Sequence, residues 1–146
     1  MEESGLNLPQ DKLILIIDDD DSVRELLEFV VKKEGFQVES AVDGEEGLQK
    51  IQRLMPSLVV LDLMLPRYGG FEVLRQLQLG ETTNIPIVII TGRYTDRTTA
   101  EMIRQESNVH EFLEKPIKPQ VLGMALHKIL KTRPPDLGGS LRQVGK

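Results

Sequence analysis

Short, uninterrupted apolar runs alternate along this chain with stretches whose apolar residues recur every three or four positions. The first run, Leu13–Ile17, ends at a series of acids, and its length and composition are typical of a strand buried on both faces. The stretch after it carries apolar residues along one helical face, namely Val23, Leu26, Leu27, Val30 and Val31. This alternation predicts an α/β fold in which helices cover both faces of a parallel sheet.

The whole pattern predicts five strands and five helices. Strands are expected at 13–17, 36–41, 57–62, 85–90 and 109–113. Helices are expected at about 23–31, 45–54, 71–77, 95–105 and 120–131, and Asp20 or Asp21 can cap the first of them. The fourth helix is the least apolar, so we expect it to pack loosely at an edge of the domain.

Length and composition indicate one globular domain, because 146 residues match the size of about 150 residues per domain. We assign residues 12–131 to this domain, 1–11 to an N-terminal extension and 132–146, with Pro134-Pro135 and Gly138-Gly139, to a linker or tail. The net charge of -5 disfavours direct nucleic-acid binding by the domain, and the absence of cysteine excludes disulfides and thiolate metal sites. No apolar run approaches the roughly 20 residues needed to cross a membrane, so we expect a cytoplasmic protein without membrane contact.

Polar side chains stand where the predicted strands end. In chain order they are Asp18 and Asp19, Asp62, Thr91 and Lys115. Parallel strands place their carboxyl ends at one edge of the sheet, and ligands bind at this edge where the strand order reverses. We therefore expect these five side chains to form one polar site.

Three carboxylates at one edge need a cation, since like charges ~4 Å apart at an effective dielectric constant near 20 repel by about 4 kcal/mol. The candidate ligands are all oxygens, which favours Mg²⁺, with Mn²⁺ as an alternative, over zinc or copper. Mg²⁺ usually keeps coordination positions for phosphate oxygens, and the ammonium of Lys115 suits another phosphoryl oxygen. The site is therefore suited to hold a phosphoryl group beside a carboxylate nucleophile.

Four separated motifs occur here in the order and at the spacing of a known family. They are Ile16–Asp19, Val60–Pro66 followed by Gly69-Gly70, Ile89–Thr91 and Phe112–Pro116. With these motifs the chain resembles the receiver domain of two-component response regulators over about residues 12–131. The resemblance implies a doubly wound (βα)5, flavodoxin-like fold, and a signalling module in a phosphorelay rather than an enzyme.

The resemblance also implies roles for the acids. Asp62 would accept a phosphoryl group from a phosphohistidine of a sensor histidine kinase or a phosphotransfer protein. Asp19 would bind Mg²⁺ directly and Asp18 mostly through water. Asp62 and the backbone carbonyl of Met64 would be further metal ligands.

The same resemblance implies a switch. Thr91 and Lys115 would each bond a phosphoryl oxygen, and Thr91 would move inward while Phe112 rotates from solvent into the vacated space. The surface of the fourth helix, fifth strand and fifth helix would change as a result, and it would bind targets or a second copy of the chain. In this family the Lys115-Pro116 peptide bond would be cis.

Two other functions stay open from the sequence alone. Haloacid dehalogenase-like phosphohydrolases also use acids after a first strand, and Asp18 would then be the nucleophile. The chain lacks the Gly-Thr pair, the late acidic pair and the cap domain of those enzymes. A receiver-like scaffold that is never phosphorylated would act through protein contacts alone.

A few positions depart from the receiver pattern. Gly69 stands where an acid is common, and Gly92 replaces a small alanine after Thr91. Asn108-Val109 stands where a Gly-Ala pair is usual, and asparagine tolerates the left-handed conformation better than most other residues, so a helix-ending turn can survive there. His110 and His127 match no metal-ligand spacing, and we expect both at the surface or half-buried.

Overall fold

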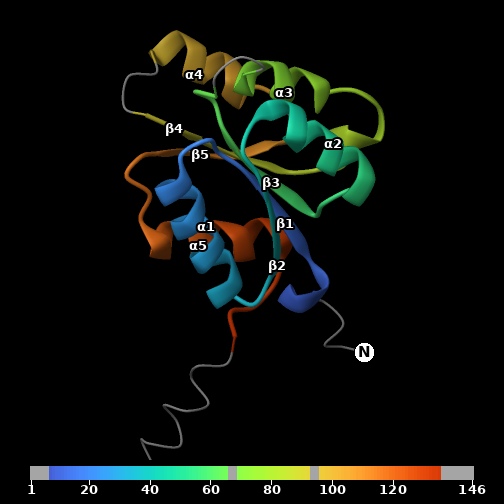
Figure 1. Ribbon diagram of the computed structural model, residues 1–146, viewed down its shortest axis with the longest axis vertical. Helices are drawn as coiled ribbons and strands as arrows, with labels where there is room; N and C mark the ends of the chain where they lie inside the picture. Colours follow the sequence, from blue (N-terminus) through green and yellow to red (C-terminus); the bar gives the residue numbers. More distant parts are fainter. Residues whose placement is uncertain (1–6, 66–68, 93–95, 136–146) are drawn as a thin grey trace, which may run out of the picture.

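Five parallel strands form one sheet at the centre of the protein (Figure 1). In the computed structural model, which describes residues 7–65, 69–92 and 96–135, the order across the sheet is β2-β1-β3-β4-β5. The strands are β1 (Leu13–Ile17), β2 (Gln37–Ala41), β3 (Leu58–Asp62), β4 (Ile87–Thr91) and β5 (Val109–Glu114). The strand order reverses between β1 and β3, and their carboxyl ends are therefore the place where this fold binds ligands.

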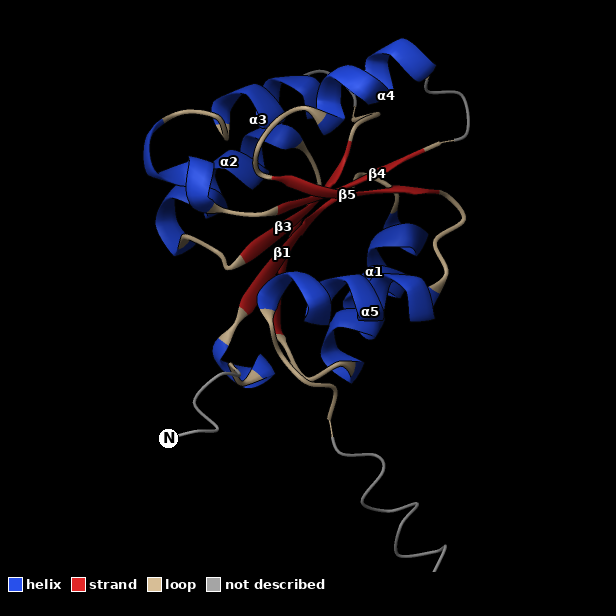
Figure 2. Cartoon of the chain, turned by 180° about the vertical axis from the view of Figure 1, so that it is seen from behind, coloured by secondary structure: helices blue, strands red, loops and turns tan. Residues whose placement is uncertain are grey.

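Helices cover both faces of the sheet. They are α1 (Asp21–Lys33), α2 (Gly44–Leu54), α3 (Gly70–Gln76), α4 (Arg97–Arg104) and α5 (Pro119–Leu130). Helices α1 and α5 lie on one face, and α2, α3 and α4 lie on the other, as both views show (Figures 1 and 2). The doubly wound (βα)5 fold predicted from the sequence is confirmed, and no helix among the described residues is long and apolar enough to cross a membrane.

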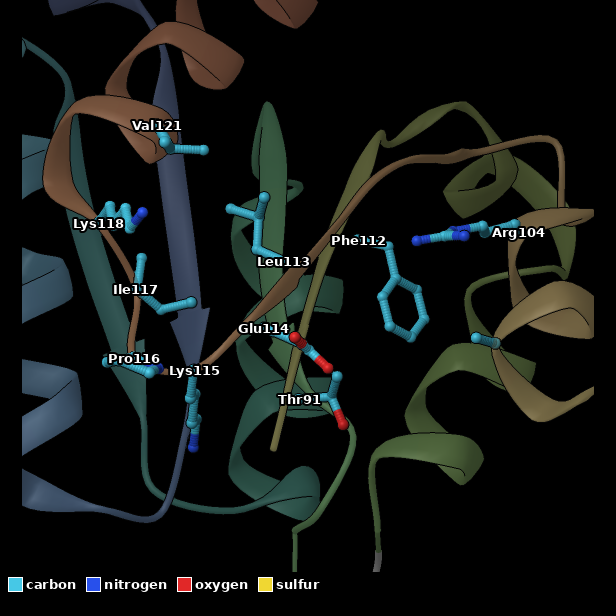
Figure 3. A pocket seen from close by; sticks show the side chains of 11 residues that line it. Thr91, Arg104, Phe112, Leu113, Glu114, Lys115, Pro116, Ile117, Lys118 and Val121 are labelled. Carbon is cyan, nitrogen blue, oxygen red and sulfur yellow. The ribbon is translucent and has the colours of Figure 1, made fainter. Parts of the chain in front are cut away.

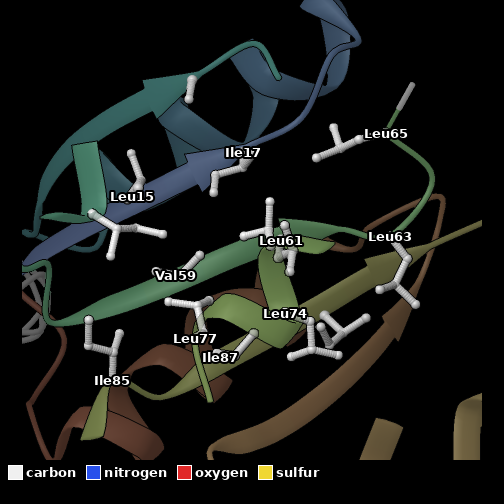
Figure 4. Close-up of a cluster of buried hydrophobic side chains, with 14 of the residues drawn as sticks. Leu15, Ile17, Val59, Leu61, Leu63, Leu65, Leu74, Leu77, Ile85 and Ile87 are labelled. Carbon is white, nitrogen blue, oxygen red and sulfur yellow. The ribbon is translucent and has the colours of Figure 1, made fainter. Parts of the chain in front are cut away.

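The strands contribute to two apolar cores, because successive strand side chains point to opposite faces of the sheet. On β1, Leu15 and Ile17 pack on the side of α2, α3 and α4 (Figure 4), while Ile14 and Ile16 pack on the side of α1 and α5. All four side chains are fully buried, and burial of each stabilises the fold by about 1.5–3 kcal/mol. This two-sided burial explains why the strand sequences are uninterrupted apolar runs.

Aspartates start three of the helices. Asp20, Asp43 and Asp96 each accept a hydrogen bond from the backbone N–H three residues later, at 2.7–3.0 Å. Such caps contribute about 1 kcal/mol each. Asp20 is therefore the cap of α1, one of the two candidates from the sequence. Ile103 is the buried residue of α4, in agreement with the loose packing predicted for this helix.

The chain around Thr132 packs against the rest of the domain. The backbone N–H of Asn7 donates to the carbonyl of Lys131 at 3.1 Å. His127 is buried, with Nδ1 2.7 Å from Thr132 Oγ1 and Nε2 2.8 Å from Glu34 Oε1. The expectation that His127 lies at the surface or half-buried is wrong, because polar partners on both sides allow the ring to be buried beside α1.

Asn108 does not use the left-handed conformation that asparagine tolerates. Among the described residues other than glycine, positive φ angles occur at Met55 and Lys131, the residues that follow α2 and α5. The buried amide of Asn108 instead donates to the carbonyl of Leu77 at 3.2 Å and accepts from Gln78 Nε2 at 2.9 Å. The side chain of Asn108 therefore connects the start of β5 to the residues that follow α3, and no left-handed turn occurs at Asn108.

Gly70 allows α3 to begin directly against the turn that follows β3. A Cβ atom at this position would lie 2.4 Å from the carbonyl oxygen of Asp62 and 2.5 Å from Cα of Leu63. Both are backbone atoms of the turn, so they cannot move aside as the end of a flexible side chain could. The close approach at Gly70 thus helps to fix the position of Asp62.

We predict that Gly70→Ala lowers the free energy of unfolding by about 1–3 kcal/mol, because the added methyl group overpacks the turn after β3. Urea denaturation in metal-free buffer measures this change. Gly92→Ala is the matched control, since a Cβ at Gly92 would meet nothing within 4 Å. The control should leave the stability unchanged or raise it by up to about 1 kcal/mol. Equal stability of Gly70→Ala and the wild type would show that the turn relaxes without cost.

Candidate functional site

Three carboxylates meet at the carboxyl end of the sheet. Asp18 and Asp19 directly follow β1, and Asp62 is the last residue of β3. One carboxylate oxygen from each residue lies within 4.8 Å of the other two. Asp18 and Asp62 are buried, whereas Asp19 is exposed. The structure thus gathers the three predicted acids into one cluster, which is accessible from solvent at Asp19.

Backbone N–H groups orient the two buried carboxylates. Oδ1 of Asp18 accepts a hydrogen bond from the N–H of Asp20 at 2.9 Å, and Oδ1 of Asp62 accepts one from the N–H of Met64 at 2.9 Å. Each bond closes a local turn of the kind that aspartate favours. Met64 therefore lies in the turn directly after β3, and the metal-binding role of its carbonyl oxygen stays a prediction.

Lys115 reaches both buried carboxylates. Its Nζ donates a hydrogen bond to Oδ2 of Asp62 at 3.2 Å and lies 3.3 Å from Oδ2 of Asp18. Its backbone N–H donates to the carbonyl oxygen of Thr91 at 2.8 Å, which ties the end of β5 to the end of β4. The following peptide bond, Lys115-Pro116, is cis. The predicted lysine is therefore held against the acidic cluster by its own backbone.

Burial works against the charges in this cluster. Desolvation raises the pKa of Asp18 above its ordinary value, and the hydrogen bond from Asp20 and the charge of Lys115 only partly counteract this effect. For Lys115, burial lowers the pKa, but the negative charges of Asp62 and Asp18 outweigh burial and leave the pKa raised. The lysine is thus fully charged at neutral pH, and one ammonium faces three carboxylates.

A divalent cation fits this arrangement of oxygens. Oδ2 of Asp18 is buried and has no hydrogen-bond partner within the described ranges, because Lys115 lies at ion-pair distance without the geometry of a hydrogen bond. A buried charged oxygen in this condition is costly unless a cation binds it. An oxygen-only ligand set is also the one that Mg²⁺ and Mn²⁺ prefer. The cluster is therefore compatible with a divalent metal site.

Thr91 and Phe112 line a groove beside the cluster (Figure 3). The groove has a volume of about 720 Å³ and lies between α4, β5 and the start of α5. Thr91 is buried at the end of β4. Phe112 is half-buried and packs against the core under α2, α3 and α4, rather than standing in solvent as the switch scheme expects. The guanidinium of Arg104 lies 4.8 Å from the centre of its ring.

Arg24 is a residue near the site that sequence reasoning missed. Its Nη1 donates to the backbone carbonyl of Asp18 at 2.9 Å, and its Nη2 pairs with the carboxylate of Asp21. The spacing of Asp21 and Arg24 on α1 was a signal for the ion pair, because residues three apart are neighbours on a helix. The contact with the Asp18 carbonyl has no comparable signal, since it depends on how α1 packs against the end of β1.

We predict that Asp18→Asn raises the free energy of unfolding by about 1 kcal/mol in metal-free buffer near pH 7, because it removes an incompletely paired buried charge. The amide oxygen still accepts the N–H of Asp20. The difference should shrink as the pH falls towards ~3.9, since the folded wild type binds a proton at Asp18 before the unfolded chain does. Urea denaturation between pH 7 and pH 4.5 measures both effects.

Adding Mg²⁺ should reverse the order of stabilities. At a concentration of 100 times its Kd, a ligand stabilises the folded state by about 2.7 kcal/mol, and Asp18→Asn should gain much less than the wild type. Asp20→Asn is the matched control, because asparagine caps a helix as well as aspartate does. This control should follow the wild type in both buffers. A loss of stability in metal-free Asp18→Asn at pH 7 would contradict the unfavourable burial of this charge.

Comparison with known proteins identifies the family. The model of the response regulator receiver domain matches residues 14–127. The transcriptional regulatory protein AfsQ1 of Streptomyces coelicolor is 35% identical over 118 residues, which cover 81% of this chain and 51% of AfsQ1. The DNA-binding response regulator MtrA of Mycobacterium tuberculosis is 39% identical over 109 residues, which cover 75% of this chain and 46% of MtrA. The chain thus spans about half the length of the curated relatives it matches.

Solved structures agree with this result. The receiver domain of NtrX from Brucella abortus has a TM-score of 0.73 and 29% identity, covering 82% of this chain and 99% of that one. A CheY-like response regulator receiver domain protein from Methanospirillum hungatei has a TM-score of 0.75 and 26% identity, covering 86% of this chain and 95% of that one. With the family model matching most of its length, the chain belongs to the response regulator receiver domains, the signalling modules of two-component systems.

Proposed function

We propose that this chain is a phosphoacceptor receiver domain, which takes a phosphoryl group onto Asp62 from a phosphohistidine of a sensor histidine kinase or a phosphotransfer protein. The setting of Asp62 carries the proposal. Its buried carboxylate accepts a backbone N–H on one oxygen and the ammonium of Lys115 on the other, beside two further carboxylates. A carboxylate in this setting is a nucleophile surrounded by groups suited to a phosphoryl group and a metal ion.

In the proposed reaction an oxygen of Asp62 attacks phosphorus and forms an acyl phosphate. The P–N bond of the phosphohistidine breaks, and the imidazole leaves with a proton taken from solvent. The residues that would hold Mg²⁺, or Mn²⁺ in its place, are Asp18, Asp19, Asp62 and the carbonyl of Met64. When bound, this ion neutralises charge on the phosphoryl oxygens.

Lys115 and Thr91 would hold the product. Because Nζ of Lys115 lies 3.2 Å from Oδ2 of Asp62, a phosphoryl oxygen on Asp62 would come close to the same ammonium. The Thr91 hydroxyl, on the neighbouring strand, would donate to another phosphoryl oxygen. Phosphorylation replaces one negative charge with about -1.5 to -2 and adds three acceptor oxygens. It therefore strengthens the pull on both residues.

Movement of Thr91 towards the phosphoryl group would change the groove that Thr91 and Phe112 both line. Movement of the threonine changes the space next to the half-buried ring, and the ring and Arg104 rearrange with it. The consequence is a shift in population between two forms of the surface made by α4, β5 and α5. We propose that targets, or a second copy of the chain, bind this surface in the phosphorylated form.

The family suggests where this switch works and what it binds. AfsQ1 and MtrA are a transcriptional regulator and a DNA-binding regulator, and this chain spans about half of each. We propose that residues 12–131 form the switching domain, that it works in the cytoplasm and that it binds no nucleic acid itself. The net charge of -5 of the whole chain supports the last point. Its chemistry would be limited to its own phosphorylation and dephosphorylation.

We predict that incubation with Mg²⁺ and a small phosphodonor such as phosphoramidate adds one phosphoryl group, which hydroxylamine removes because it is an acyl phosphate. Asp62→Asn should abolish the labelling, since an amide is not a nucleophile here. Intact-protein mass spectrometry measures the added group. Asp20→Asn, an exposed acid on the same edge with the same change of charge, should be labelled like the wild type.

Two results would favour the other functions. Multiple turnover of a phosphomonoester that requires Asp18 and survives Asp62→Asn would indicate a phosphohydrolase with its nucleophile after β1. A wild type that binds Mg²⁺ but takes up no phosphoryl group from any donor or kinase would indicate a scaffold.

We predict that beryllofluoride with Mg²⁺, a phosphoryl mimic, shifts the NMR signals of Thr91 and of the Phe112 ring. Thr91→Ala should still bind the mimic near Asp62, but the shift at Phe112 should largely disappear, because the hydroxyl that transmits the change is missing. Thr99→Ala on α4 is a control for loss of a threonine outside the groove. An unchanged response of Phe112 in Thr91→Ala would exclude the proposed coupling.

A further inference from the structure

Besides the helix cap at Asp20, the side chain of Arg24 fastens the acidic loop after β1 to the first turns of α1. Arg24 reaches back along the helix, and its Nη1 donates to the backbone carbonyl of Asp18 at 2.9 Å. Its Nη2 pairs with the carboxylate of Asp21, three residues earlier on the same helix. The Arg24 side chain is 15% exposed, so this fork is largely packed into the domain rather than free in solvent.

The carbonyl that Arg24 holds belongs to the peptide that joins two members of the acidic cluster. A peptide unit is planar, so fixing the carbonyl of Asp18 also fixes the N–H and the Cα of Asp19. The Asp18 side chain is already oriented by the N–H of Asp20. Arg24 therefore fixes the backbone of Asp19, and with it the direction in which the exposed Asp19 side chain points.

We propose that Arg24 is a positioning residue for the divalent metal site, which holds the Asp18–Asp19 peptide in the orientation that directs both carboxylates to one cation. The inference rests on the proposed metal-dependent function and adds a residue outside the ligand set. Groups that orient metal ligands in this way typically contribute 10–100-fold to metal affinity.

The positive charge of Arg24, taken alone, predicts the opposite effect on Mg²⁺ affinity. A guanidinium close to a cation site repels the cation, so its removal would strengthen Mg²⁺ binding if electrostatics decided the outcome. Asp21 pairs with Arg24 and cancels much of that positive charge. The positioning effect should therefore dominate, and the direction of the change in affinity separates the two explanations.

The test is a calorimetric titration of Mg²⁺ into the full chain and its variants, at a temperature where circular dichroism shows each of them folded. Arg24→Met keeps the apolar stem and the helix propensity but removes the charge and the donors. We expect its Kd for Mg²⁺ to rise 10–100-fold. Arg24→Lys should fall in between, because one ammonium can reach the carbonyl but cannot span both acceptors as a guanidinium does.

Asp21→Asn is the matched control. It weakens the ion pair of Arg24 but leaves the contact with the Asp18 carbonyl, so we expect its Kd to stay within about 3-fold of the wild type, as for an exposed ion pair. The rate of phosphorylation in Arg24→Met should recover at saturating Mg²⁺, since the phosphoacceptor itself is unchanged. Because the variants are compared under conditions where each is folded, a general loss of stability does not account for this dependence on Mg²⁺.

Equal or tighter Mg²⁺ binding by Arg24→Met would overturn the positioning role and leave the proposed function intact. If Arg24→Met does not fold, Arg24→Lys decides: a Kd equal to that of the wild type would overturn the role, and a raised Kd would support it. Failure of the wild type itself to bind Mg²⁺ would overturn both this inference and the metal dependence in the proposed function.

Discussion

The repulsion among three carboxylates at the end of one sheet governs how this protein is built and how it can switch. Asp18 follows β1 and Asp62 closes β3, and these strands are neighbours in the sheet. Neighbouring strands lie ≈ 4.8 Å apart, so the two buried carboxylates cannot avoid each other. Lys115 offsets part of this repulsion from the end of β5. The repulsion that Lys115 does not offset favours binding of a cation.

The surrounding packing prevents the cluster from relieving its repulsion by movement. Every residue of β3 and β4 is buried, and two apolar cores hold these strands from opposite faces. Gly70 brings α3 against the turn after Asp62, and the bond from Lys115 N–H to the Thr91 carbonyl ties β5 to β4. Asp18 therefore stays buried in the cluster, with a pKa raised first by burial and then by the charge of Asp62, and its Oδ2 has the ion-pair contact with Lys115 but no hydrogen-bond partner among the described residues.

Much of this arrangement could be predicted from the sequence, because it follows from periodicity and from one topological rule. Apolar runs mark the strands, and the acids at their ends must meet where parallel strands end. The ends of the elements are predicted less well. The strand expected at 85–90 begins at Ile87, after Pro86, because proline has no N–H to donate to a neighbouring strand. The contacts of Arg24, the burial of His127 and the amide links of Asn108 could not be predicted. Each depends on how two elements pack together, which periodicity does not determine.

The most direct measurement is the position of the phosphoryl group. The chain is treated with Mg²⁺ and phosphoramidate, the acyl phosphate is reduced with borohydride to homoserine, and peptide mass spectrometry locates the converted residue. We expect homoserine at position 62 and at no other aspartate, since Asp62 combines burial, a backbone donor and contact with Lys115. Conversion at Asp18 or Asp19, or a phosphoryl group that stays on a histidine, would contradict the assignment of Asp62 as the phosphoacceptor.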